Sequence, residues 1–105
     1  MELEGKVAAV TGGSRGIGRA IAKRLAESGC DLFLVALSEG NLESTAGEMA
    51  ETGRHVETCA TDLRTLPGCE AVRRSLNDTF GRVDILINCA GATKGGRFVE
   101  TPDEQ

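Results

Sequence analysis

Aromatic residues are nearly absent from this 105-residue sequence, which has three phenylalanines and neither tryptophan nor tyrosine. The missing tyrosine matters most, because no phenol hydroxyl is available in these residues to donate or accept a proton. Cysteine occurs four times but never as a Cys-x-x-Cys pair, which excludes the usual zinc and thioredoxin-like spacings. We therefore expect no metal site, and we expect the thiols to be small buried hydrophobic groups in a reducing compartment.

Long apolar runs and an excess of positive charge are also lacking. No stretch approaches the roughly 20 apolar residues that a membrane span requires. The opening residues, Met-Glu-Leu-Glu-Gly-Lys, contain no apolar segment typical of a secretory signal. A formal net charge of −4 argues against a nucleic-acid or anionic-membrane partner. Together with 40% hydrophobic and 27% charged residues, this composition predicts a cytoplasmic globular protein.

Four short apolar runs predict β-strands over residues 6–11, 32–37, 55–61 and 83–88. A helical pattern and only a few connecting residues separate each run from the next, which indicates βαβ units and a parallel sheet with helices on both faces. In the third run apolar and polar side chains alternate, as in a strand at a sheet edge. The predicted fold class is therefore α/β, with a Rossmann-type doubly wound parallel sheet in the strand order 3-2-1-4.

Three amphipathic helices are predicted between these strands. Ser38 is a suitable N-cap for the second helix, and the third helix is expected to follow Pro67. Glycines at positions 29, 53 and 81 are expected to end the three helices. The residues expected to face the core are Ile17, Ile21 and Leu25 in the first helix, Leu42, Ala46 and Met49 in the second, and Cys69, Val72, Leu76 and Phe80 in the third.

Two features near the end of the sequence predict that the domain continues. Thr-Pro-Asp-Glu at residues 101–104 has the pattern of a capping box that begins a helix. The fourth predicted strand would be a sheet edge, yet no charge or proline protects Ile-Leu-Ile at residues 85–87. We therefore expect residues 1–105 to be the N-terminal dinucleotide-binding part of one domain that extends further.

A glycine-rich segment, residues 11–18, joins the first predicted strand to the first helix. Gly12 permits a tight turn, Gly16 lets an anionic ligand approach the backbone, and Gly18 lets helix and strand pack closely. The N–H groups and dipole of the following helix favour a phosphate. A mononucleotide P-loop is excluded because Arg19-Ala20 replaces the required Lys-Ser/Thr. Taken alone, the segment could also be a purely structural turn.

Three motifs in this order resemble the short-chain dehydrogenase/reductase (SDR) family. Residues 11–18 match its fingerprint Thr-Gly-x-x-x-Gly-x-Gly after the first strand. Asp-Leu at 62–63 follows the third predicted strand, and Asn-Cys-Ala-Gly at 88–91 follows the fourth. The family usually has asparagine where Cys89 stands. Each motif lies at the carboxyl end of a strand, where open α/β sheets bind their ligands.

The resemblance implies a nicotinamide dinucleotide as cofactor, with the pyrophosphate and adenosine ribose on the first motif, the adenine on the second and the nicotinamide ribose on the third. On the residues alone, the carboxylate at position 62 could instead cap a turn. The implied binding residues are Gly12, Ser14, Arg15, Gly16, Ile17 and Gly18, then Asp62 and Leu63, and then Asn88, Ala90 and Gly91.

The end of the second predicted strand favours NADP(H). NAD-preferring enzymes place an acid there to hold the ribose 2′-hydroxyl, and this sequence has Ala36. Arg15 could pair with a 2′-phosphate, and Ser38 could add a hydrogen bond. NAD remains possible, because NADP enzymes of the family often carry a second basic residue where Leu37 stands, and because Arg15 could be a solvated surface charge.

In the family, a Tyr-x-x-x-Lys with a nearby Ser and Asn assists hydride transfer to a carbonyl or from an alcohol. This constellation lies beyond the fourth strand, so we expect no catalytic residue among residues 1–105 and no activity of this chain alone. The resemblance also implies a small carbonyl or alcohol substrate and a homo-oligomer for a full-length form. Two alternatives remain: a non-catalytic nucleotide-binding module, and a methyl transferase that uses S-adenosylmethionine.

Overall fold

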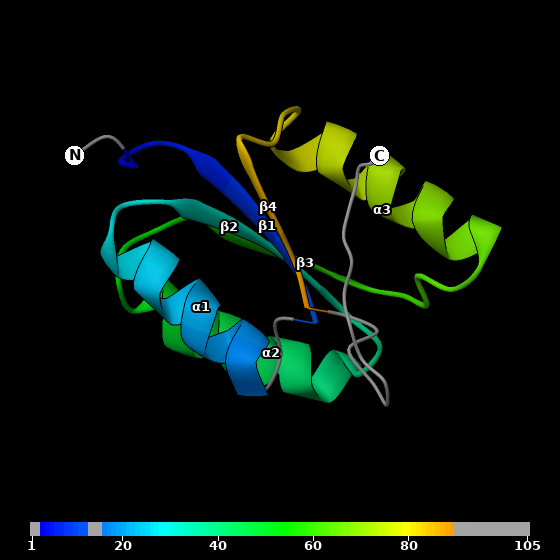
Figure 1. Cartoon of the computed structure of the whole chain (residues 1–105), viewed down its shortest axis with the longest axis horizontal. Helices are drawn as coiled ribbons and strands as arrows, with labels where there is room; N and C mark the ends of the chain where they lie inside the picture. Colours follow the sequence, from blue (N-terminus) through cyan, green and yellow to red (C-terminus); the bar gives the residue numbers. More distant parts are fainter. Residues whose placement is uncertain (1–2, 13–15, 90–105) are drawn as a thin grey trace.

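The computed structural model describes residues 3–12 and 16–89 and has a parallel four-stranded sheet with helices on both faces (Figure 1). The strand order is β3-β2-β1-β4, which confirms the predicted fold class and places the alternating third strand at an edge. The predicted capping box at 101–104 lies outside the described residues. In chain order the elements are β1 (Val7–Thr11), α1 (Gly16–Glu27), β2 (Asp31–Ala36), α2 (Glu39–Ala50), β3 (Val56–Ala60), α3 (Leu66–Thr79) and β4 (Ile85–Asn88).

The register aligns the carboxyl ends of the four strands. Thr11, the last residue of β1, is paired with Val35 of β2 on one side and with Asn88 of β4 on the other. Val35 in turn is paired with Cys59 of β3. Because all of the pairs are parallel, the loops that leave these strands emerge at the same edge of the sheet.

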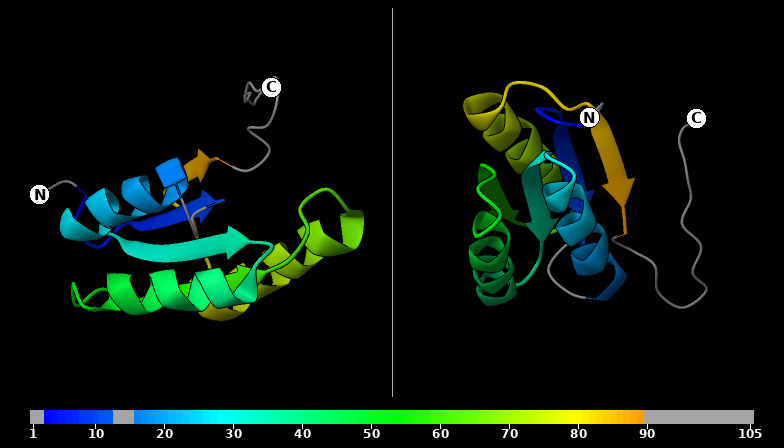
Figure 2. Two further views of the ribbon diagram at one scale, coloured as in Figure 1. Left: turned by 90° about the horizontal axis from the view of Figure 1, so that it is seen from below. Right: turned by 90° about the vertical axis from the view of Figure 1, so that its left-hand side faces the viewer.

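Alternate side chains of the strands build two separate cores. On one face, Ala8, Val10, Leu32 and Leu34 are fully buried beneath α1 and α2. On the other face, a smaller core of strand residues, which includes Phe33, is covered by α3. Figure 1 shows α1 and α2 side by side on one side of the sheet and α3 on the other, and Figure 2 shows the same layers from two further directions. None of the helices in residues 3–12 and 16–89 is long and apolar enough to cross a membrane.

The buried face of α1 differs in part from the predicted one. Gly18, Ala22 and Ala26 are buried against the sheet, whereas Ile17 is 75% exposed. Of the expected residues, Leu25 packs against the core as predicted. Both stripes have the same four-residue spacing, so periodicity alone could not separate them. The small side chains are the buried ones because they let the helix lie close to the strands. Arg19 of α1 contacts the neighbouring helix, where its Nε donates to Oε1 of Glu48 in α2 at 2.9 Å.

Smaller corrections concern the other two helices and the cysteines. In α2, Thr45 is buried in place of Ala46, which is half-buried. The helix α3 begins at Leu66, one residue before Pro67, because Thr65 is its N-cap. Cys69 is exposed rather than part of the core stripe. Cys30 is fully buried and Cys59 and Cys89 are half-buried, so the expectation of buried thiols was wrong for Cys69 alone.

The amino ends of β1 and β4 are held together by a carboxylate. Asp84, just before β4, accepts hydrogen bonds from the backbone N–H of Val7 at 2.8 Å and from Nε of Arg82 at 3.0 Å. Nη2 of Arg82 also donates to the carbonyl oxygen of Gly5 at 2.8 Å. The Val7 N–H, and then Arg82, hold the pKa of Asp84 below its ordinary value. This Asp84 clamp joins residues that lie 77 positions apart in the sequence.

Candidate functional site

The candidate site is the edge of the sheet where all four strands end. Gly12 follows β1, Ser38 lies two residues after β2, and Asp62 lies two residues after β3. Asn88 is the last residue of β4. The parallel register therefore brings residues from all three sequence motifs, together with Ser38, to one edge. In open α/β sheets this is the edge where ligands bind.

Gly12 and Gly16, which lie on either side of residues 13–15, have backbone conformations that favour glycine. Gly12 has φ +74° and Gly16 has φ +60°, and both values lie in the left-handed region where side chains are strained. The N–H of Gly12 donates to the carbonyl oxygen of Val35 at 2.6 Å, which continues the sheet by one residue. Gly18 is buried at the contact of α1 with the sheet. The predicted residues Ser14 and Arg15 lie outside the described residues.

Space around Gly16 suits an anionic ligand. A Cβ atom at this position would meet no atom within 4 Å, so the start of α1 is open. The first turn of a helix carries N–H groups without partners in the helix, and the helix dipole favours negative charge there. No acidic residue lies in the first turn of α1. The residues present therefore fit a phosphate or diphosphate group.

Asn88 is held by a threonine that the sequence reasoning did not include as a site residue. The hydroxyl of Thr11 donates to Oδ1 of Asn88 at 2.7 Å, across the pair of residues that ends β1 and β4. The signal was present, because Thr11 opens the glycine fingerprint. Burial raises the pKa of the neighbouring Cys89 thiol, which keeps it protonated and poorly reactive near neutral pH. Ala90 and Gly91 lie outside the described residues.

Residues 36–38, at the end of β2, present a hydroxyl and no carboxylate. Ala36 is the last residue of the strand and Leu37 is 65% exposed. Ser38 is the N-cap of α2, as predicted, and its Oγ accepts from the backbone N–H of Asn41 at 3.2 Å. A serine hydroxyl that accepts in this way still has a hydrogen to donate. Glu39, the next residue, lies in the first turn of α2, where its charge complements the helix dipole.

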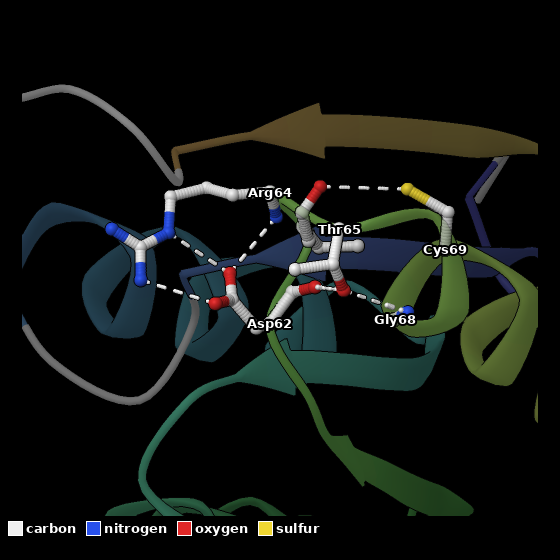
Figure 3. Close-up of polar contacts among 6 residues, drawn as sticks. Asp62, Arg64, Thr65, Gly68 and Cys69 are labelled. Carbon is white, nitrogen blue, oxygen red and sulfur yellow. Dashed lines mark hydrogen bonds and ion pairs between the residues drawn. The ribbon is translucent and has the colours of Figure 1, made fainter.

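The loop after β3 fixes Asp62 by several hydrogen bonds (Figure 3). Its Oδ1 accepts from the backbone N–H of Arg64 at 2.9 Å and from Nε of Arg64 at 3.0 Å, and its Oδ2 accepts from Nη2 at 3.1 Å. These bonds from Arg64 hold the pKa of Asp62 below its ordinary value, so the carboxylate is charged at neutral pH. The sequence analysis predicts Asp62 as a site residue and does not include Arg64, which contacts it.

Two predicted apolar residues differ in how they meet the surface. Ile17, in the first turn of α1, is 75% exposed beside the open start of that helix. Leu63 is half-buried and packs against the core beneath α3, where Phe33 and Val35 are its neighbours. Part of each side chain is therefore available to an apolar surface such as a purine ring.

The described residues at this edge of the sheet offer groups that suit the binding of a ligand. Residues 3–12 and 16–89 contain no group of three or more His, Cys, Asp and Glu side chains placed to hold a metal ion. The one histidine, His55, lies before β3 and contacts Glu57 and Phe80 instead of the candidate site. The arrangement can bind an anion at α1, accept a hydrogen bond at Asp62 and present an amide at Asn88.

Comparison with known proteins agrees with these motifs. The family model of the short chain dehydrogenases matches residues 6–105. The 3-oxoacyl-[acyl-carrier-protein] reductase FabG of Vibrio harveyi is 40% identical over 105 residues, which is 100% of this chain and 42% of that protein. The chain thus spans about two fifths of the length of the curated relatives that it matches in this way.

Solved structures give the same result. L-sorbose reductase from Gluconobacter frateurii, in complex with NADPH and L-sorbose, is 43% identical to this chain, and the two structures superpose with a TM-score of 0.82. The match covers 84% of this chain and 34% of the reductase chain. An NAD+-bound xylitol dehydrogenase is 30% identical, with a TM-score of 0.78, and the match covers 82% of this chain and 33% of the dehydrogenase chain. Sequence motifs, sheet order and relatives agree, and the chain belongs to the short-chain dehydrogenase family of oxidoreductases.

Proposed function

We propose that this chain binds NADP(H) as the cofactor-binding part of an SDR oxidoreductase that acts on a carbonyl or alcohol substrate. The observation that carries the proposal is the open space at Gly16, where α1 begins, with Asp62 and Asn88 at the same sheet edge. Gly12, Gly16 and Gly18, with the neighbouring Ser14, Arg15 and Ile17, would hold the diphosphate and the adenosine ribose. The nicotinamide would supply or accept the hydride.

The remaining residues of the edge would orient the two rings. Asp62 would accept a hydrogen bond from the adenine amino group, and Leu63 would lie against the ring. Asn88, with Ala90 and Gly91, would line the path toward the nicotinamide ribose. The hydrogen bond from Thr11 supports this role, because it fixes the Asn88 carbonyl and leaves the amide nitrogen as donor.

The preference for NADP(H) rests on the end of β2. Ala36 offers no carboxylate to repel a 2′-phosphate, and the Ser38 hydroxyl can donate to it while it caps α2. Arg15 would supply the compensating charge. The NADPH complex of L-sorbose reductase supports this choice, although the xylitol dehydrogenase complex holds NAD+.

Titration calorimetry of the 105-residue chain with NADPH and NADH tests the proposal. We expect NADPH to bind more tightly, and we expect Arg15→Ala to lower its affinity about tenfold or more while NADH affinity stays the same, since a hydrogen bond to a charged group contributes about 1.5–3 kcal/mol. Arg24→Ala is the control, because it removes the same charge from the last turn of α1. Equal binding would overturn the NADP preference, and binding of neither would overturn the cofactor assignment.

The same chain is expected to show no turnover with NADPH and a panel of ketones. None of its 105 residues is a tyrosine, so the proton relay of the family cannot form from them. The decrease in the absorbance of NADPH measures its oxidation. Oxidation of NADPH above the rate without protein would show that these residues hold a catalytic group that we have not identified.

A further inference from the structure

The loop between β3 and α3 contains an aspartate and an arginine two residues apart whose side chains bind each other as a fork (Figure 3). Nε of Arg64 donates to Oδ1 of Asp62 at 3.0 Å and Nη2 donates to Oδ2 at 3.1 Å. A guanidinium in this geometry fixes the plane of the carboxylate as well as its charge. The Arg64 side chain is 81% exposed and that of Asp62 is 32% exposed, so both lie where a ligand can reach them.

The backbone of the same loop is fixed as well. The carbonyl oxygen of Asp62 accepts from the N–H of Thr65 at 3.2 Å and from its hydroxyl at 3.1 Å. Oγ1 of Thr65 also accepts from the N–H of Gly68 at 3.0 Å, which caps α3. Asp62 is therefore anchored through its main chain to a helix and through its side chain to Arg64.

Counting acceptor positions shows what the Asp62 carboxylate has left to offer. A carboxylate accepts about four hydrogen bonds in its plane, two at each oxygen. Oδ1 accepts two, from N and Nε of Arg64, and Oδ2 accepts one from Nη2. One acceptor position remains, on Oδ2, in an orientation that the arginine sets. A single N–H donor on a flat ring matches that position.

We propose that Arg64 is a positioning residue of the adenine subsite, which fixes the Asp62 carboxylate so that it accepts from a 6-amino purine and rejects a 6-oxo purine. The inference rests on the proposed binding of a dinucleotide and adds a source of base selectivity. The adenine amino group donates one hydrogen to the remaining position on Oδ2. A 6-oxo group brings an oxygen toward the same carboxylate and is repelled. Without the guanidinium, only the backbone N–H of residue 64 still holds the carboxylate, through Oδ1, so Oδ2 can turn toward water and the selectivity falls.

Calorimetry with NADPH and deamino-NADPH, in which hypoxanthine replaces adenine, measures this selectivity. For the unchanged chain we expect NADPH to bind about tenfold to a hundredfold more tightly, the size expected for one hydrogen bond to a charged acceptor. Arg64→Gln should reduce the ratio to about threefold or less, chiefly through weaker binding of NADPH. Arg64→Lys keeps the charge without the planar fork and should recover the ratio only in part.

Arg73→Gln is the matched control. Arg73 lies on α3 and its Nη2 donates to Oε1 of Glu70 at 2.7 Å, so the change removes an equal charge and an exposed ion pair away from Asp62. We expect it to preserve the selectivity of the unchanged chain. Thermal unfolding followed by circular dichroism checks that all variants are folded, and the exposure of Arg64 predicts little change in melting temperature.

Three results would overturn the assignment to Arg64 while the proposed function stands. They are an unaltered ratio in Arg64→Gln, an equal loss of affinity for both dinucleotides, and full recovery by Arg64→Lys. Equal binding of NADPH and deamino-NADPH to the unchanged chain would show that Asp62 does not read the amino group, which overturns the inference alone. If the unchanged chain binds neither dinucleotide, the proposed function fails and the inference falls with it.

Discussion

Gly68 lies where the first turn of α3 meets the loop that carries Asp62. A Cβ atom on Gly68 would overlap the carbonyl oxygen of Asp62 and lie 2.7 Å from its carbonyl carbon. Those atoms are backbone and cannot rotate away, so the close approach needs a residue without a side chain. Gly68 is also the only buried residue of α3, among the described residues. A glycine in a helix normally costs about 1 kcal/mol relative to alanine, and here the contact with the loop reverses that preference.

We therefore predict that Gly68→Ala destabilises the chain by about 1–3 kcal/mol, the usual cost of an overpacked contact. Gly47→Ala, in α2, is the matched control, because its Cβ would meet nothing within 4 Å and helix propensity should make it neutral or stabilising by up to about 1 kcal/mol. Urea unfolding followed by far-ultraviolet circular dichroism measures both, since the chain has no tryptophan or tyrosine to follow by fluorescence. Equal stability of the two variants would contradict the steric argument.

For single residues, the sequence predicts the motif positions but not the hydrogen bonds that fix their side chains. The positions of Asp62 and Asn88 after strands follow from the apolar runs and the motif spacing, and the structure has both at the expected edge. Their binding roles stay predictions. The Arg64 fork could not be predicted, because it depends on the path of a short loop. Gly68 gave no signal beyond being a glycine near the start of a predicted helix.

Helix α1 packs on the sheet through small residues, and a carboxylate joins two of the strands. Gly18, Ala22 and Ala26 let α1 lie against the sheet, and the Asp84 clamp joins the starts of β1 and β4. The strand order was predictable, because short apolar runs alternate with helices and the third run has an edge pattern. The face of α1 was not, since its large apolar residues and its small ones repeat with one spacing. Only the distance between helix and sheet decides between them.

The Asp84 clamp predicts an acid-sensitive stability. The pKa of Asp84 is lowered in the folded chain from its ordinary 3.8, so its contribution is complete above about pH 5 and is lost as the pH falls through the lower folded value. We expect Asp84→Asn to have a lower melting temperature than the unchanged chain at pH 7. The difference should shrink below pH 4, because the unchanged chain then loses the same charge.

Melting curves by circular dichroism between pH 3 and 7 test this, with Asp78→Asn as control. Asp78 is an exposed aspartate on α3, and its replacement removes the same charge without touching the sheet. A constant difference between Asp84→Asn and the unchanged chain at every pH would show that the clamp acts through its shape and not through its charge.

The two edges of the described sheet differ in how far their side chains are protected from solvent. At one edge, β3 is short and its side chains are half-buried or exposed. At the other edge, β4 pairs only with β1 among the described strands, and Leu86 at its middle is 66% exposed. No charged residue lies within Ile85–Asn88 to discourage a further strand. This confirms the exposed fourth strand that the sequence predicted.

We predict that the 105-residue chain self-associates through β4. In an antiparallel pair of β4 strands, Leu86 would face its own copy, and Ile85 would face Ile87. Light scattering after gel filtration at micromolar to millimolar concentration should show species larger than a monomer. Leu86→Lys should shift the chain to monomer, whereas Leu66→Lys, at a residue 81% exposed on α3, should not. A monomer at all concentrations would be incompatible with this prediction.

The Asp84 clamp also has a consequence for synthesis on the ribosome. Val7 and Asp84 are 77 residues apart, so β1 is made long before its second neighbour exists. At about 5–20 residues per second, on the order of 4–15 s separates the two. During that interval β1 can pair with β2 alone, and one side of its backbone remains open to water and to other nascent polypeptides. Of the two strands that have a neighbour on each side, β1 is thus enclosed later than β2.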